Sequence, residues 1–358
     1  MAKIFTGIDD NDKILGRQTE VANGLWSNDT GSLSAIYSAS VQIGISGEYY
    51  YDMYNLPESS TEKEVQFSVA YGHINGGGSP PLSTTVLNGN STLPTQVIYS
   101  QYRNILLPSG SKFTFGTTEV SAESDEIYVI NIARARVKQY LDPGNWQLSL
   151  SGSNGIFTFI DTSEFGGTIG QDVIAAVSYD IRSGSIDSGL DSSTTIFGKV
   201  FPDYGVIILD PKAISSSVGF VNPAANGRLS TAFPFAPYTG SNVTTYQYQH
   251  EGLVRSISAS MAQGFPFVGR SIEKVNSNNY FITLNQNDYN YTNNPSYYIV
   301  NSVGERVVRP AFENQPVTYP TTIGLYNGAN ELLAVAKLSR PVQKAPDKRL
   351  TVRVRLDY

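Results

Sequence analysis

A two-residue alternation of apolar and polar side chains is the feature that most constrains how this chain can fold. At the C-terminus, Val352, Val354, Leu356 and Tyr358 fall on one face of an extended chain, and polar or charged residues fall on the other. That period is typical of a half-buried β-strand. Strands are predicted by the same reasoning at residues 65–71, 146–150, 156–160, 127–137, 173–181, 194–201, 205–209, 280–284, 321–326 and 331–338. The sequence therefore predicts a mostly β fold of antiparallel, sandwich-type sheets with few short helices and long loops.

Two turn signals indicate hairpins within this pattern. Residues 151–155 (SGSNG) separate two strand candidates, and residues 327–330 (NGAN) separate 321–326 from 331–338. We expect residues 350–358 to add a strand to the second hairpin. Because residues 331–338 are apolar on both alternating faces, they are predicted to form a central strand that is buried on each side, with Leu333 inside.

Helical signals are few. Asp210-Pro211 offers an N-cap followed by proline at the first helical position, and apolar residues recur at helical spacing over 253–261. We divide the chain into an N-terminal arm (1–34), a β domain (35–210), a loop-rich insertion with short helices (211–275) and C-terminal β-strands (276–358) that could complete the main domain.

Composition excludes several classes of protein. A hydrophobic fraction of 40% is too high for a disordered chain, and a net charge of −6 offers no general attraction to phosphates, so nucleic acid is not expected as a partner. With no cysteine, disulfides and thiolate chemistry are removed. No apolar stretch approaches the length of a membrane span or signal peptide, so we expect a soluble product of the cytoplasm that does not contact a membrane.

No residue pattern supports catalysis. The chain has two histidines, His73 and His250, and no G-x-S-x-G nucleophile elbow. His73 is interpreted as a loop histidine bonded to backbone, and His250 as an interface residue. The acidic run 9–12 lacks the glycine and glutamate of a calcium loop. We therefore predict a protein that is not an enzyme, and we assign no catalytic, cofactor-binding or metal-binding residue.

Two groups of residues are candidates for an interface. The first is basic and could meet an acidic neighbour, although it could equally be a solvated strand face that prevents edge-to-edge aggregation. The second is aromatic and could be a carbohydrate-binding surface, although packing in a core or interface explains it better. The basic group is Lys348, Arg349, Arg353 and Arg355, and the aromatic group is Tyr289, Tyr291, Tyr297 and Tyr298.

Four ordered segments carry a resemblance to a known family. Residues 321–341 (TTIGLYNGANELLAVAKLSRP), which lead to 352–358, resemble the C-terminal signature of virion structural proteins from contractile-tailed phages, in particular the T-even-like cyanophages and giant phages. Residues 130–146, 204–211 and 289–296 are also similar to that group. The resemblance covers about residue 125 to the C-terminus, and it does not extend to the first 120 residues.

The resemblance implies a structural subunit of the virion tail, of baseplate wedge or peripheral baseplate type, that assembles in the host cytoplasm. Its expected partners are other tail or baseplate proteins and further copies of itself in a homo-oligomer. No catalytic residue or cofactor comes with the family. The alternative is a receptor-binding or tail-fibre attachment module at the tail tip, and a glycan hydrolase is a third class, which would need converging carboxylates.

Overall fold

The computed structural model describes residues 7–39, 50–76, 94–165, 176–219 and 249–358. The chain divides into two compact units, a central unit of residues 20–273 and a terminal unit that combines residues 1–19 with 274–358. Strands β1 (Lys13–Gly24) and β18 (Arg270–Leu284) each contain residues of both units. The predicted boundary at 275 lies close to the observed one, whereas those at 34 and 210 fall inside the central unit.

The central unit is built on a ten-stranded antiparallel sheet. Its strand order is β10-β11-β12-β15-β16-β8-β5-β4-β3, with β13 paired to β12. The strands are β3 (Tyr37–Ala39), β4 (Tyr50–Tyr54), β5 (Val65–His73), β8 (Glu126–Ile132), β10 (Leu148–Gly152), β11 (Gly155–Asp161), β12 (Tyr179–Ser185), β13 (Gly189–Leu190), β15 (Gly198–Phe201) and β16 (Val206–Leu209). The hairpin predicted around residues 151–155 is confirmed as β10–β11, and residues 173–175 of a predicted strand lie outside the described residues.

Smaller elements complete the central unit. One group is the three-stranded sheet β14-β6-β7 and the pair β17-β2. These strands are β2 (Ser32–Leu33), β6 (Phe113–Thr117), β7 (Ser121–Ser124), β14 (Thr195–Ile196) and β17 (Phe267–Val268), and β9 (Tyr140–Leu141) pairs with β18. The helices are α1 (Pro94–Leu106), α2 (Arg134–Val137), α3 (Pro211–Val218) and α4 (Gln249–Ala262), with short 3-10 turns η2 (Ser27–Asp29) and η3 (Ser163–Phe165).

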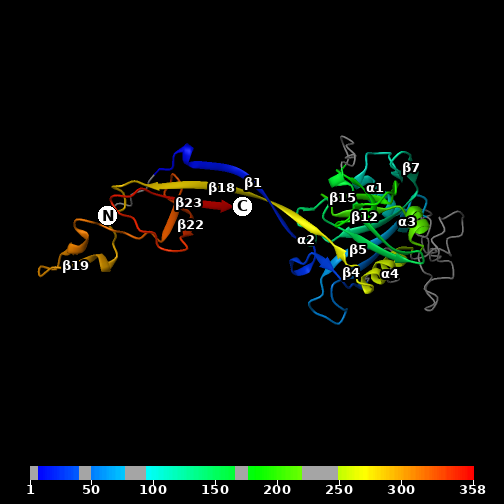
Figure 1. Cartoon of the computed structure of the whole chain (residues 1–358), viewed down its shortest axis with the longest axis horizontal. Coiled ribbons are helices and arrows are strands. Elements are labelled where there is room, and N and C mark those ends of the chain that lie inside the picture. Colours follow the sequence, from blue (N-terminus) through cyan, green and yellow to red (C-terminus); the bar gives the residue numbers. More distant parts are fainter. Residues whose placement is uncertain (1–6, 40–49, 77–93, 166–175, 220–248) are drawn as a thin grey trace, which may run out of the picture. The chain divides into compact units, whose positions relative to one another are not determined.

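The central strands of the large sheet are apolar at most positions and are buried on both faces. On β8, Ile127 and Val129 point to one hydrophobic core with α1 and β6, whereas Tyr128 and Ile130 point to the other with α4. Figure 1 shows α1 and α4 on opposite sides of this sheet. The near-continuous burial of β8 and β16 follows from this double cover.

The two helices predicted in the sequence are present in the structure. The Asp210 side chain accepts a hydrogen bond from the Lys212 backbone N–H at 3.1 Å, so it caps α3 as expected. Helix α4 contains the predicted 253–261 segment and places Leu253 and Ile257 in the core. The sequence interpretation did not include α1, although its apolar residues at 98, 99, 102 and 106 approach helical spacing.

The terminal unit has smaller sheets than the central unit. Its sheet has the order β1-β18-β23, in which β18 pairs antiparallel with β23 (Leu350–Asp357) from Ser277↔Asp357 to Leu284↔Leu350. Two separate hairpins accompany it, β19 (Tyr298–Val300) with β20 (Arg306–Val308) and β21 (Thr322–Tyr326) with β22 (Leu332–Lys337). The 3-10 turns are η1 (Asp10–Asp12), η4 (Pro295–Tyr297) and η5 (Pro310–Phe312).

Two expectations about this unit are corrected. The predicted hairpin forms, but β23 pairs with β18 and does not extend the β21–β22 hairpin. Residues 1–34 are predicted to be an arm, but they contain strand β1, which pairs with β18. Glycine and polar residues obscure the two-residue alternation of β1, so the sequence does not indicate this strand. The mostly β, antiparallel fold class with few helices and long loops is confirmed.

Candidate functional site

Exposed apolar side chains are concentrated in the terminal unit. Of the 24 large hydrophobic side chains exposed among the described residues, 14 belong to this unit, which has less than a third of the chain. Within the described part of this unit, only four hydrophobic residues are buried, namely Tyr297, Leu325, Ala345 and Val354. The two hydrophobic core clusters among the described residues belong to the central unit. The terminal unit therefore has an apolar surface that its own fold does not cover.

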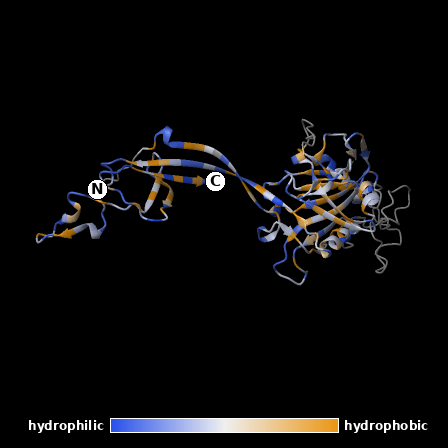
Figure 2. Ribbon diagram, in the orientation of Figure 1, coloured by the Kyte–Doolittle hydropathy of each residue, from blue (hydrophilic) through white to orange (hydrophobic). Residues whose placement is uncertain are grey.

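The β21–β22 hairpin contributes much of that surface. Leu332, Leu333 and Val335 have exposed fractions of 52, 67 and 54%. The predicted burial of β22 on both faces is therefore wrong within the single chain, because β21 is its only strand neighbour in the described structure. On β19–β20, Val300 and Val303 are exposed as well. Figure 2 shows hydrophobic colour on both hairpins.

The basic group lies where the alternation places it. Arg353 and Arg355 project from the exposed face of β23, whereas Val354 on the opposite face is buried. Arg355 pairs with Asp357 at 2.6 Å between Nε and Oδ1. Lys348 and Arg349 are exposed in the turn before β23. Strand β23 ends the order β1-β18-β23, so its basic face adjoins a sheet edge among the described strands.

The tyrosine group is divided by the structure. Tyr289 and Tyr291 are exposed and Tyr298 is half-buried, but Tyr297 is only 3% exposed. Tyr297 stacks on Phe312 with ring centroids 4.6 Å apart and donates a hydrogen bond to the Asn290 carbonyl at 3.0 Å. Tyr297 therefore packs inside this region of the chain. Its expected role as an interface residue is corrected, because the buried ring is not accessible to a partner.

A buried lysine holds the loops beside these tyrosines. The Lys344 Nζ, in a residue with no exposed area, donates to the Gln286 carbonyl, the Asn290 Oδ1 and the Ala345 carbonyl at 3.0 to 3.1 Å. Its backbone also exchanges two hydrogen bonds with Thr318. All three ammonium protons are therefore satisfied by neutral oxygens. The sequence interpretation missed this residue, because a lysine in a polar loop gives no sign that it is buried.

An open groove of about 980 Å³ lies within the terminal unit, against this lysine-centred network. Its lining includes the apolar face of β18 and β23 and one side of the β21–β22 hairpin. Tyr289, which lines it, has a backbone φ of +55°, a conformation that a bulky residue adopts only when its surroundings impose it. Thr318 Oγ1 donates to the Tyr289 carbonyl at 2.7 Å, which holds this loop in place.

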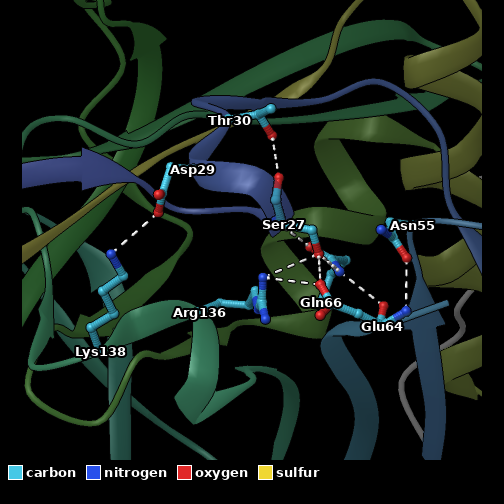
Figure 3. Close-up of polar contacts among 8 residues, drawn as sticks. All are labelled: Ser27, Asp29, Thr30, Asn55, Glu64, Gln66, Arg136 and Lys138. Carbon is cyan, nitrogen blue, oxygen red and sulfur yellow. Dashed lines mark hydrogen bonds and ion pairs between the residues drawn. The ribbon is translucent and has the colours of Figure 1, made fainter. Parts of the chain in front are cut away.

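The central unit has a polar network at the end of β1, drawn in Figure 3. Ser27 Oγ donates to Glu64 at 2.5 Å and accepts from Gln66 at 2.7 Å and from Arg136 at 3.1 Å. Lys138 pairs with Asp29 at 3.2 Å. The Glu64 carboxylate that accepts from Ser27 is also paired with the Arg136 guanidinium at 3.3 Å. The network connects η2, β5 and α2, and it is suited to fixing the chain after β1.

Both histidines are buried in the central unit. His73 Nδ1 accepts a hydrogen bond from the Asn75 backbone N–H at 3.1 Å, which confirms the predicted bond to backbone. His73 is the last residue of β5, however, and not a loop residue. Burial lowers the pKa of His73. The His250 ring packs 5.3 Å from the Tyr51 ring and is 3% exposed. The proposed interface role of His250 is therefore wrong, since α4 turns the side chain towards the sheet.

A buried carboxyl lies across the ladder from His73. Glu126 is the antiparallel partner of His73, and its carboxylate accepts a hydrogen bond from Tyr71 at 2.7 Å. Burial raises the pKa of Glu126, and the Tyr71 hydrogen bond opposes part of that shift. Tyr71, His73 and Glu126 are all buried in the sheet.

No group of three or more histidine, aspartate or glutamate side chains in the described ranges is arranged to hold a metal ion. Among those same residues, no helix is long and apolar enough to cross a membrane. Comparison with known proteins adds no relative: no family model, no curated protein and no solved structure matches this chain.

Proposed function

We propose that this protein is a structural assembly protein whose terminal unit binds neighbouring subunits. The single observation that carries the proposal is the exposed apolar surface of that unit, combined with its four buried hydrophobic residues. An isolated two-stranded hairpin is at best marginally stable in water, and the unit contains two of them. Docking on a neighbour would cover both hairpins and stabilise them.

We further propose that the particle is a contractile-tailed bacteriophage and that the chain is a baseplate subunit of wedge or peripheral type. This step rests on the resemblance of residues 321–341 to virion structural proteins. The same residues form the β21–β22 hairpin, where the exposed apolar side chains lie. A signature that falls on uncovered surface supports a role in contacts between subunits.

The basic face of β23 supplies a second, polar contact in this proposal. Arg353, Arg349 and Lys348 are exposed, and salt bridges at the rim of an interface direct orientation more than they add affinity. We expect an acidic surface on the neighbouring subunit. Copies of this chain and other tail proteins are the proposed partners.

The experiment that tests the proposal measures incorporation into phage particles. Leu332→Ser combined with Val335→Ser removes two exposed apolar side chains, and we expect a severe loss of the chain from purified particles, measured by quantitative mass spectrometry. The matched control is Val97→Ser with Ile105→Ser, two exposed positions of the central unit. The location of the chain within the particle is determined by electron cryo-microscopy, from the difference density between particles with a tagged chain and particles with the untagged chain.

Absence of the wild-type chain from purified particles would refute the phage assignment. Normal incorporation of the Leu332→Ser/Val335→Ser protein would refute the role of the terminal unit while leaving the phage assignment intact.

A further inference from the structure

The groove in the terminal unit is lined by aromatic rings that remain accessible. Five tyrosines contribute to it, and four of them have exposed fractions of 36 to 63%. They are Tyr280, Tyr289, Tyr291, Tyr319 and Tyr326. Rings that stay open to solvent on the wall of a groove can stack against the flat, apolar face of a ligand. A volume of about 980 Å³ is at the upper end of small-ligand sites, so the groove has room for a ligand of several rings.

The lining of the groove is electrically neutral. Among the described residues that line it there is no aspartate or glutamate, and the one cation, Lys13, is paired with Asp10 at 2.9 Å. The remaining polar groups are hydroxyls and amides, among them Thr292, Asn327 and Asn330. A cationic ligand would find no carboxylate in this lining, and an anionic one would find only a lysine that is already paired. Thr292 Oγ1 accepts a hydrogen bond from the Asn294 N–H, and its hydroxyl can still donate to a polar ligand.

The groove is also held in shape before any ligand arrives. Lys344 fixes the 286–290 loop by its hydrogen bonds, and Tyr289 is kept at positive φ beside Thr318. The Tyr291 ring meets the Tyr297 ring edge-on, with centroids 6.1 Å apart. Because these loops are already ordered, binding would cost little further conformational entropy.

From this chemistry we propose that the groove binds a neutral oligosaccharide. A sugar ring has an apolar face of C–H groups that stacks on tyrosine and an edge of hydroxyls that hydrogen-bonds to amides and other hydroxyls. A chain of such rings is uncharged, and it has apolar faces for the tyrosine rings and hydroxyls for the polar groups of the lining. It therefore matches the groove in size, charge and hydrogen bonding. Tyr326 and Leu333 of the β21–β22 hairpin line the groove, whereas Leu332 and Val335, the two positions changed in the incorporation test, do not.

The test uses the full chain and an array of neutral oligosaccharides built from glucose, galactose, mannose, rhamnose and N-acetylglucosamine, with sialylated oligosaccharides alongside. The strongest neutral hexasaccharide is then titrated by calorimetry. We expect Tyr291→Ala and Tyr319→Ala each to weaken binding about tenfold, the loss of roughly one stacking contact. Tyr291→Phe should bind within about twofold of wild type, because it keeps the ring.

Tyr358→Ala is the matched control, since Tyr358 is exposed in the same unit but outside the groove. Circular dichroism of each variant checks that it is folded. The proposal is overturned if no neutral saccharide on the array binds, if the Tyr291→Ala/Tyr319→Ala protein binds as well as wild type, or if sialylated ligands bind more tightly. These outcomes concern saccharide binding alone, and the assembly function is tested separately by incorporation into particles.

Discussion

At the residue scale, the most informative side chain is a lysine that holds three loops together. Lys344 is fully buried, yet each of its three protons has an acceptor, which offsets the cost of removing the ammonium from water. Its acceptors come from residues 286, 290 and 345, so one side chain connects segments that are more than 50 residues apart in sequence. The loop geometry of the terminal unit depends on this network.

We expect Lys344→Met to destabilise the terminal unit by about 2 kcal/mol. Methionine fills a similar volume but leaves three buried oxygens without a donor, and each unsatisfied group costs roughly 1–3 kcal/mol of stability. Part of this loss is offset because the variant no longer buries a charged ammonium group. Chemical denaturation followed by tyrosine fluorescence measures the change. Lys348→Met, at an exposed position nearby, should shift stability by less than about 0.5 kcal/mol. Equal effects of the two substitutions would contradict the structural role of Lys344.

A second residue-scale prediction concerns pH. The folded-state pKa of Glu126 is raised, chiefly by burial, so the folded protein holds the proton more tightly than the unfolded chain does. The stabilising contribution of the protonated form is therefore complete below the unfolded pKa of about 4.3 and is lost as pH rises through the folded pKa. Glu126→Gln mimics the protonated form and can still accept the Tyr71 hydrogen bond.

We therefore expect Glu126→Gln to be more stable than wild type at neutral pH, with the difference disappearing at pH 4 and below. Thermal melts across this range give the measurement, and comparing the two proteins cancels the other titrating groups. A difference that grew as the pH fell would show that the sign of the pKa shift is wrong.

At the scale of elements, β22 shows how a sequence pattern and a single-chain structure can differ. Its apolar residues lie on both faces, as in a central strand, but β21 is the one strand paired with it among the described residues, and its leucines are exposed. Strand β23, in which apolar and polar residues alternate, instead pairs along its full length with β18. A partner subunit that covers β22 would reconcile the pattern with its surroundings.

The hairpin allows a direct comparison of two leucines. Leu325→Asp places a carboxylate at a position that is 9% exposed, and it should cost about 3 kcal/mol of stability. Leu333→Asp, at 67% exposure, should cost less than about 1 kcal/mol in the free chain, in contrast to what the sequence alone predicts. Arg353→Ala should also leave folding nearly unchanged. Thermal melts rank the three, and a larger loss for Leu333→Asp than for Leu325→Asp would contradict the exposed position of β22.

At the scale of the whole molecule, stability is unevenly distributed. Among the described residues, both hydrophobic cores belong to the unit of residues 20–273, whereas the unit formed by 1–19 and 274–358 has four buried hydrophobic residues. Local stability follows buried apolar area, so the two units need not unfold together.

We expect urea to unfold the free chain in two steps, with the terminal unit first. Hydrogen exchange followed by mass spectrometry should show fast exchange in residues 298–308 and 322–337 and slow exchange in β5, β8 and β16. Lys344→Met should move only the first step. A single transition with uniform protection would contradict the independence of the two units, and strong protection of both hairpins in assembled particles would support the proposed assembly role.

The amino-acid sequence by itself determined the fold class, the β10–β11 and β21–β22 hairpins, helices α3 and α4, and the exposed arginine face of β23. Each depends on a local property: side-chain period, turn residues or a cap, which neighbouring residues specify without help from the rest of the chain. For Tyr289 and Tyr291 the sequence allowed either an exposed binding surface or packing, and the structure shows both side chains exposed.

Only the tertiary structure decided which strand pairs with which, that Lys344 and Tyr297 are buried, and that Leu333 is exposed. The pairing of β1 with β18 joins residues about 250 positions apart, and Lys344 meets its acceptors across more than 50. No local pattern encodes such distant partners, because a side chain's burial depends on which segments the folded chain brings against it.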